Sequence, residues 1–468
     1  MEAKATVHSD LIRRAVETVA ESWGDLIHRD ERRGGSELSE REVPRLRALL
    51  AACADARGGE ASTRKRIATL AELYTRLGAE GKTRFLRLLA EFAVRPAVFA
   101  EPLAELESNP DVPAAASRLR DALEPPWLRI LRSFNVLENG TKFLVDLRAD
   151  VLERSREFSE LRPLEADLRE LLATWFDLGF LELRRITWDA PASLLEKLAR
   201  YEAVHEVRGW LGLKDRLDTD RRCFAYLHPA MPNEPLVFVE VALTDHLPDR
   251  IAPLIDPKAP RGDAGAAKVA AFYSISACQQ GLAGISFGNA LIKGVVSALS
   301  AEHQHLRTFT TLSPIPGFRA WLDAQPEQPG WNAESRALLE RPGWPRDAAL
   351  ELALERPLLR LCARYLLEAR GRDGAPLDPV ERFHLSNGAR LERLCWLGDR
   401  SAKGLRESAG LMVNYLYRLD EIETNQEAYG GTQTIAASRT VRELAREPLE
   451  TPRRKRPVST PNPATPAT

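Results

Sequence analysis

Residues 269–312 read VAAFYSISACQQGLAGISFGNALIKGVVSALSAEHQHLRTFTTL, and this segment sets the fold class of the second half of the chain. Residues 269–278 and 307–312 are apolar and β-rich, which predicts two strands, while residues 289–302 have the apolar spacing of a helix. Because the crossover in a strand, helix, strand unit is right-handed, the two strands are expected to be parallel neighbours in one sheet.

Further elements are predicted on both sides of this unit. A Pro-containing hairpin connection joins two apolar, β-rich segments upstream, and strands and helices alternate downstream. The additional predicted elements are strands at 222–227, 236–244, 390–397 and 411–417, and helices at 334–339 and 357–367. We therefore expect an α/β or α+β domain over residues 183–446.

The chain before residue 183 has a different pattern, with one amphipathic helix after another from Ser9 to about Phe180. Turn residues such as Pro125-Pro126 and Asn139-Gly140 separate the helices. Three apolar stripes at helical spacing are Phe85-Leu88-Leu89-Phe92, Phe143-Leu144-Leu147-Val151 and Leu168-Leu171-Leu172-Trp175. This pattern predicts an all-α helical bundle over residues 1–182. Residues 447–468, rich in Pro and Thr after a short basic run, are expected to be a disordered tail.

Composition excludes several classes of protein. In 468 residues, Lys+Arg number 66 and Asp+Glu 67, so the net charge of -1 gives no basic field for nucleic acid. No apolar segment is long enough to span a bilayer, and the N-terminus lacks the apolar core of a signal peptide. The five cysteines are scattered without a CxxC pair, so neither a disulfide framework nor a zinc site is expected. We expect a soluble, cytoplasmic protein.

A glycine-rich turn between a predicted strand and a predicted helix is the first candidate binding site. Free N–H groups at a helix N-terminus, approached closely because of glycine, can bind a phosphate or pyrophosphate. The turn lacks the Lys-Ser/Thr of a Walker A loop and the G-x-G-x-x-G pattern of a dinucleotide fold. A tight turn that binds no ligand is an equally good interpretation of the segment. The candidate residues are Ala283, Gly284, Ile285, Ser286, Phe287, Gly288 and Asn289.

The same turn contains Gly-Ile-Ser-Phe-Gly around Ser286, which matches the G-x-S-x-G elbow of α/β-hydrolases. A hydrolase would need an acid and then a His downstream. Asp378 and His384 are available, but they lie too close in sequence for the usual strand and helix between them. An N-cap role for Ser286 is the better interpretation.

Two other segments contain candidate catalytic groups. Ser313, in a Leu-Ser-Pro-Ile-Pro-Gly-Phe segment, ends the strand after the crossover helix, where ligands of open α/β sheets collect. His384 lies between Phe383 and Leu385, and a partly buried imidazole can exchange a proton near neutral pH. From composition alone, an ordinary Ser-Pro turn and a hydrogen-bonded core His are the better interpretations. No His/Cys pattern indicates a metal.

Residues 221–444 resemble the catalytic domain of the malonyl-CoA decarboxylase family, and the helical half resembles that family too. The segments that carry the resemblance are Phe272-Tyr-Ser-Ile-Ser276, Gln279-Gln-Gly-Leu282, Leu291-Ile-Lys293, Leu312-Ser-Pro-Ile-Pro-Gly-Phe318, Phe383-His-Leu385, Asn387-Gly-Ala389, Gly410-Leu-Met412, Asn414-Tyr415, Phe176-Asp-Leu-Gly-Phe-Leu181 and Ile186-Thr-Trp188.

The resemblance implies a helical oligomerisation domain, a catalytic domain with the acyltransferase fold of the GNAT superfamily, and a homotetramer. It implies that Ser313 and His384 are catalytic and that residues 283–289 form the coenzyme A loop. Ser274 and Tyr417 match further polar positions of the active site. Ser286 stands where a glutamate is expected in animal members, so the role of that carboxylate has no counterpart here.

The implied substrate is malonyl-CoA and the implied reaction is loss of CO₂ to give acetyl-CoA. No cofactor is needed, because the thioester itself accepts the electron pair as an enolate, which is then protonated at Cα. The sequence leaves open whether Ser313 or His384 donates this proton. Lys293 and Arg307 are candidates for the 3′-phosphate of coenzyme A. A GNAT-like acyltransferase, an acyl-CoA hydrolase using Ser286 and an inactive coenzyme A-binding scaffold are the alternatives.

Overall fold

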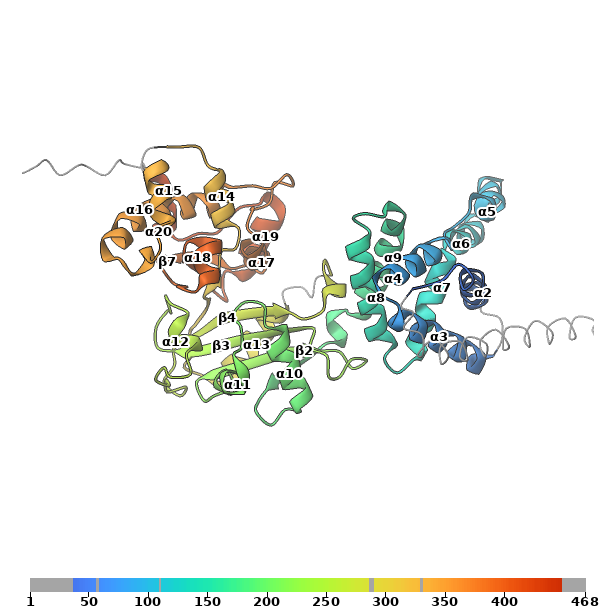
Figure 1. Ribbon diagram of the computed structural model, residues 1–468, viewed down its shortest axis with the longest axis horizontal. Coiled ribbons are helices and arrows are strands. Elements are labelled where there is room, and N and C mark those ends of the chain that lie inside the picture. Colours follow the sequence, from blue (N-terminus) through green and yellow to red (C-terminus); the bar gives the residue numbers. More distant parts are fainter. Residues whose placement is uncertain (1–36, 56–58, 109–110, 286–289, 329–330, 448–468) are drawn as a thin grey trace, which may run out of the picture.

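The computed structural model describes residues 37–55, 59–108, 111–285, 290–328 and 331–447. Figure 1 shows a helical part and a part built around a sheet, side by side. The predicted fold class, an all-α N-terminal part followed by an α/β C-terminal part, is confirmed.

The helical part has a continuous apolar core formed by the predicted stripes. Phe85, Leu144 and Leu168 are all fully buried in it. The predicted breaks are also confirmed, since α7 begins at Pro126 and α8 at Gly140. Its elements are α2 (Val43–Ala54), α3 (Glu60–Arg76), α4 (Ala79–Ala90), α5 (Pro96–Ser108), α6 (Val112–Leu123), α7 (Pro126–Ser133), η1 (Phe134–Val136), α8 (Gly140–Arg154), η2 (Ser159–Leu161), α9 (Arg162–Trp175) and η3 (Leu178–Phe180).

The C-terminal part contains one mixed sheet. Within the described residues its strand order is β1-β2-β3-β4-β5-β8-β6, and β7 pairs with β8. The predicted hairpin β2–β3 is antiparallel and the predicted pair β4–β5 is parallel. The strands are β1 (Glu182–Ile186), β2 (Arg221–Leu227), β3 (Val237–Thr244), β4 (Val269–Ala277), β5 (Thr308–Thr311), β6 (Ser313–Pro314), β7 (Arg390–Cys395) and β8 (Met412–Tyr417).

Helices cover both faces of this sheet. Side chains of α13, α14, α16 and α20 fill the large core on one face, and α10 and α11 cover the other face near β2. The remaining elements are α10 (Ala192–Tyr201), α11 (Gly209–Asp215), α12 (Ala252–Ile255), η4 (Gln280–Leu282), α13 (Ala290–Glu302), α14 (Phe318–Ala324), α15 (Ala333–Leu339), η5 (Trp344–Arg346), α16 (Ala348–Glu368), α17 (Pro379–Ser386), α18 (Ala402–Ser408), α19 (Ile422–Thr432) and α20 (Arg439–Arg446).

One predicted helix start was wrong. The helix expected from Pro357 begins at Ala348, because the Asp347 carboxylate accepts hydrogen bonds from the N–H groups of Ala349 and Leu350. Pro357 lies inside α16, where the packing of buried Leu354 and Leu358 outweighs the lost backbone hydrogen bond.

The pairing of β4 changes halfway along the strand. Its register with β3 slips between Glu240 and Val241, so that Tyr273 is the extra residue of a β-bulge. On its other side, β4 pairs with β5 only as far as Phe272. The last hydrogen bond between the two segments is donated by Leu312 N to the Phe272 carbonyl at 2.9 Å. Beyond this point β6 pairs with β8 instead, so the chain after β5 diverges from β4.

The two parts share one apolar core. Met231 and Leu236, from the β2–β3 connection, and Leu282, after β4, are buried among side chains of the helical bundle. In Figure 1 the turn after β4 extends to α8. The described residues at the start of the glycine-rich turn therefore pack against the helical part.

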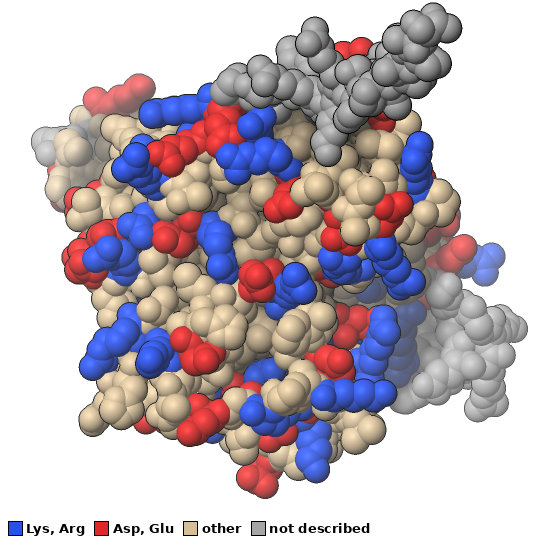
Figure 2. All heavy atoms as spheres, turned by 90° about the vertical axis from the view of Figure 1, so that its left-hand side faces the viewer, with Lys and Arg blue, Asp and Glu red and all other residues tan. Residues whose placement is uncertain are grey.

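The surface has no large area of one charge on the face seen in Figure 2, where acidic and basic side chains are interspersed. This agrees with the balanced composition. Among the described residues, no helix combines the length and the apolar character needed to cross a bilayer.

Candidate active site

Ser313, His384 and Tyr417 meet although they come from three separate segments. Ser313 lies in β6, His384 in α17 and Tyr417 at the end of β8. The Ser313 Oγ is 3.0 Å from His384 Nε2, and His384 Nδ1 is 2.9 Å from the Tyr417 hydroxyl. All three side chains are buried. The structure thus brings together both predicted catalytic residues and one of the two secondary candidates.

The direction of these hydrogen bonds follows from a fourth residue. The Ser313 hydroxyl donates to Thr311 Oγ1 at 2.9 Å, so its oxygen accepts from His384 Nε2–H. In a neutral imidazole the other nitrogen is then an acceptor, and Tyr417 donates to it. The result is a chain of donors that runs from Tyr417 through His384 and Ser313 to Thr311.

Burial holds the His384 ring in its neutral form. Desolvation lowers the pKa of His384 from its ordinary value of 6.5 to about 3, and the ring stacks on Tyr415 with centroids 4.5 Å apart. Burial also raises the pKa of Tyr417, which keeps its phenol protonated. At neutral pH the site therefore offers uncharged hydrogen-bond donors and acceptors.

Thr311 and Asn414 were not predicted as site residues. Thr311 Oγ1 also accepts from the backbone N–H of Tyr415 at 3.1 Å, and Asn414 Nδ2 donates to the Thr311 carbonyl at 2.7 Å. These bonds lock the Thr311 side chain and backbone against β8. Thr311 directly precedes the segment that contains Ser313, which is the one sequence signal that could have found it.

Ser274, the other secondary candidate, has different partners. Its hydroxyl lies 2.9 and 2.8 Å from the two carboxylate oxygens of Glu202, and Ser276 also donates to that carboxylate. Because of the bulge at Tyr273, Ser274 pairs with Glu240 of β3. The structure therefore joins Ser274 to the loop after α10.

The two carboxyl groups at the start of α17 are buried. Asp378 accepts hydrogen bonds from the N–H groups of Val380 and Glu381, and its other oxygen accepts from Gly317 N at 3.2 Å. It thereby ties α17 to the loop that follows Ser313. Asp378 makes no triad with His384, whose Nδ1 is bonded to Tyr417. Glu381 is fully buried and neither of its carboxylate oxygens has a hydrogen-bond partner.

The glycine-rich turn is described as far as Ile285. Gly284 has a φ of +75°, a conformation that favours glycine. Ala283 and Gly281 each accept a hydrogen bond from Arg148 of α8. The other predicted loop residues, Ser286, Phe287, Gly288 and Asn289, lie outside the described residues, and so does the nucleophile of the hydrolase alternative.

The candidates for the 3′-phosphate have protein partners. Lys293 Nζ lies 3.8 Å from a Glu423 carboxylate oxygen, and the Arg307 guanidinium donates to the carbonyls of Gln304 and Leu306. In the ranges that the structure covers, no group of three His, Cys, Asp or Glu side chains could hold a metal ion.

Comparisons with known proteins agree with this architecture. Residues 92–176 match the malonyl-CoA decarboxylase N-terminal domain, and residues 179–456 match the malonyl-CoA decarboxylase C-terminal domain. The chain is 39% identical over 360 residues to the mitochondrial malonyl-CoA decarboxylase of Rattus norvegicus, an alignment that covers 70% of this chain and 73% of the relative.

Solved structures are similar as well. The crystal structure of malonyl-CoA decarboxylase from Rhodopseudomonas palustris has a TM-score of 0.80 and 44% identity, covering 87% of this chain and 100% of that chain. The enzyme from Agrobacterium vitis has a TM-score of 0.81 and 43% identity, with 86% and 100% covered. With matches over both parts of the molecule, the chain belongs to the malonyl-CoA decarboxylase family.

Proposed function

We propose that the protein converts malonyl-CoA to acetyl-CoA and CO₂. The observation that carries this proposal is the 3.0 Å contact between Ser313 and His384, which lie 71 residues apart in two segments that resemble the family. The contact creates a buried pair that can hold and transfer one proton. The family membership and the pair support the same reaction.

The chemistry assigned to this pair follows from the bonds that change. The bond between Cα and the malonyl carboxylate breaks, CO₂ leaves, and the electron pair remains in the thioester enolate. Ser313 and His384 orient the carboxylate and pass a proton to Cα, and the pair regains one proton from solvent. Because His384 is neutral, the proton comes from an uncharged donor and not from an imidazolium. The thioester is the electron sink, so we propose that no cofactor takes part.

We propose that the coenzyme A portion binds at the glycine-rich turn. The turn follows β4 and Ser313 follows β5, and the two strands are parallel, so both segments leave the same edge of the sheet. We assign residues 283–289 to coenzyme A binding and regard the C-terminal part as GNAT-like.

The first experiment is mass spectrometry of the coenzyme A species after mixing purified protein with malonyl-CoA, without an acceptor and with a chelator. Acetyl-CoA is the expected product. Free coenzyme A plus malonate would instead favour a hydrolase, and unchanged malonyl-CoA an acyltransferase or a scaffold. Ser313→Ala and His384→Ala should each lower kcat by roughly a hundredfold or more, whereas a loss below about tenfold in both would contradict their assignment.

Assembly and location are part of the proposal. The hairpin formed by α5 and α6 projects from the bundle in Figure 1, and α5 has no buried residue. Leu103 and Val112 on this hairpin are 41% and 54% exposed. We propose that the helical part joins subunits through it in a homotetramer. The cysteines Cys53, Cys223, Cys278, Cys362 and Cys395 are all buried and free, which supports a cytoplasmic protein.

A further inference from the structure

We infer that Arg148, in the helical part of the chain, is a positioning residue for coenzyme A, because it fixes the peptide that presents the Gly284 N–H to the ligand. The inference rests on the proposed function and assigns to the bundle a task in substrate binding besides assembly. It concerns only residues 280–285 of the turn, which the structure describes.

The contacts of Arg148 are directed at the turn. Its side chain is 1% exposed, and a buried guanidinium needs partners for its charge and its N–H groups. Nη1 donates to the Gly281 carbonyl at 2.6 Å, and Nη2 donates to the Ala283 carbonyl at 3.0 Å. Nη2 also contacts Glu165 of α9 at 2.7 Å, which neutralises the charge. Arg148, paired with the partly buried Glu165, therefore holds the Gly281 and Ala283 carbonyls of the turn.

The backbone of the turn also rests on α8. A Cβ atom at Gly281 would lie 1.7 Å from the Val145 carbonyl oxygen, so only glycine fits at this contact. Leu282 is buried in the core of the helical part, and Ile285 packs against the same core. Gln280, Gly281 and Leu282 form η4, which packs against α8. These contacts leave the turn little freedom to shift.

The orientation of one peptide follows from this arrangement. In a trans peptide the C=O and the next N–H point in opposite directions. Because the Ala283 carbonyl points at Arg148, the Gly284 N–H points away from the helical part. The positive φ of Gly284 is that of the third residue of a type II turn, which the Ile285 N–H closes by donating to the Leu282 carbonyl at 3.0 Å, so the Gly284 N–H is the donor that faces away from Arg148. Arg148 thus acts behind the turn, and we assign the Gly284 N–H on the opposite side to a phosphate of coenzyme A, the ligand that the proposed function gives to this turn.

If Arg148 has this role, replacing it should weaken the binding of substrates that contain the nucleotide of coenzyme A and spare substrates that lack it. Ser313 and His384 belong to other elements, so the chemical step should survive when the turn loosens. We therefore compare malonyl-CoA with malonyl-pantetheine, which has the same reacting group and lacks the nucleotide. Arg148→Met should lower kcat/KM for malonyl-CoA about tenfold, mainly through KM, and change kcat/KM for malonyl-pantetheine less than threefold.

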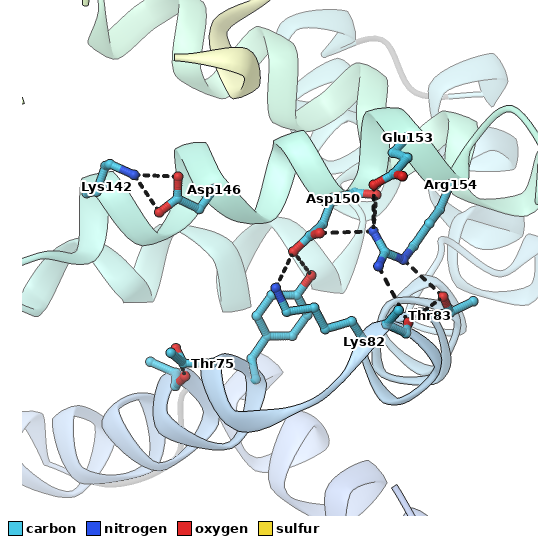
Figure 3. A network of polar contacts seen from close by, with 11 residues as sticks. Thr75, Lys82, Thr83, Lys142, Asp146, Asp150, Glu153 and Arg154 are labelled. Carbon is cyan, nitrogen blue, oxygen red and sulfur yellow. Dashed lines mark hydrogen bonds and ion pairs between the residues drawn. The ribbon is translucent and has the colours of Figure 1, made fainter. Parts of the chain in front are cut away.

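The matched control is Arg154, six residues further along α8. Figure 3 shows that Arg154 bonds Asp150 on its own helix and Thr83 on α4, and that Lys82 meets the same Asp150. All of these contacts lie within the helical part. Arg154→Met should lower the melting temperature and leave the ratio of the two kcat/KM values unchanged. Arg148→Lys retains the charge and should recover part of the preference for malonyl-CoA, and it replaces the methionine variant if that one does not fold.

Two outcomes would overturn the inference. In one, Arg148→Met lowers both kcat/KM values equally, as a general structural defect would. In the other, it lowers neither. Calorimetry with coenzyme A separates a failure of this inference from a failure of the proposed function. The Arg148 variants should bind coenzyme A about tenfold more weakly than wild type, even if the wild-type protein makes no acetyl-CoA. Unchanged affinity for coenzyme A would also contradict the assignment.

Discussion

Thr311 determines where the Ser313 hydroxyl points, because its Oγ1 accepts the Ser313 proton. Thr311→Val keeps the shape of the side chain and removes this acceptor. We expect kcat to fall about tenfold, since the hydroxyl is then free to rotate, while the affinity for coenzyme A stays the same. Steady-state kinetics and calorimetry with coenzyme A would measure the two effects.

The neighbouring Thr310 provides the control for this substitution. It is equally buried, and its hydroxyl donates to the Tyr415 carbonyl at 3.2 Å without contacting Ser313. Both Val variants should lose about 1–3 kcal/mol of stability through unpaired backbone groups. A kcat in Thr310→Val as low as in Thr311→Val would show that the loss comes from general disruption.

His384 should give the enzyme an unusual pH dependence. Because burial lowers its pKa to about 3, kcat/KM should show no inflection from this ring between pH 5 and 8. An inflection near pH 6.5 that His384→Asn removes would contradict this expectation.

The same burial makes stability sensitive to acid. The unfolded chain takes up a proton on His384 as the pH falls through 6.5, and the folded chain does not, so stability is lost progressively from pH 6.5 towards 3. Urea unfolding at pH 7.5 and pH 5 should show a smaller loss for His384→Asn than for wild type.

Among the elements, α17 contains a carboxyl group, that of Glu381, which is buried without a hydrogen-bond partner. Desolvation and the nearby Asp378 raise the pKa of Glu381 well above its ordinary value. The folded state therefore binds a proton that the unfolded state releases, and stability falls as the pH rises from about 4.3 towards the folded pKa. Glu381→Met should be more stable than wild type at pH 8, with a smaller difference at pH 5.

Denaturant unfolding at the two pH values tests this prediction. Glu368→Met, at an exposed position near the end of α16, is the matched control and should shift stability little at either pH. A variant Glu381→Met that is less stable at pH 8 than wild type would mean that the carboxylate has a favourable partner in solution.

At the scale of the whole molecule, the α5–α6 hairpin should control assembly. A charge at Leu103 and at Val112 would have to be buried in a subunit contact, at a high cost in free energy. The double variant Leu103→Glu/Val112→Glu should therefore shift the mass measured by light scattering from that of the proposed tetramer to that of a smaller species. Leu352→Glu, at a 76% exposed position on α16, should not. An unchanged tetramer in the double variant would place the subunit contact elsewhere.

The sequence predicted those elements whose local pattern agrees with their environment. Strands β2, β3 and β4 are buried along nearly their whole length and are visible as apolar, β-rich runs. Strand β1 was not predicted, because its segment Glu-Leu-Arg-Arg-Ile lies at the sheet edge with several exposed side chains. The start of α16 was missed because a buried helix can contain a proline that local rules treat as a boundary.

Among the site residues, too, some could be predicted from the sequence and others depend on the three-dimensional structure. Ser313 and His384 were named through the family resemblance, and their local pattern alone favoured a turn and a core histidine. The Tyr417 contact needed the three-dimensional path of β8. Arg148 has no local signal at all, since its partners Gly281 and Ala283 are 133 and 135 residues away in sequence. Contacts of this range depend on how the two parts dock.

The shared core also limits how such enzymes can be recombined. Met231, Leu236 and Leu282 belong to the C-terminal half by sequence and to the bundle by packing. A chimera of two relatives joined near residue 178 would therefore divide a packed interior, although the junction falls between two recognisable family domains. Exchange between relatives should succeed only when residues 228–236 and 280–285 are inherited together with the helices that they touch.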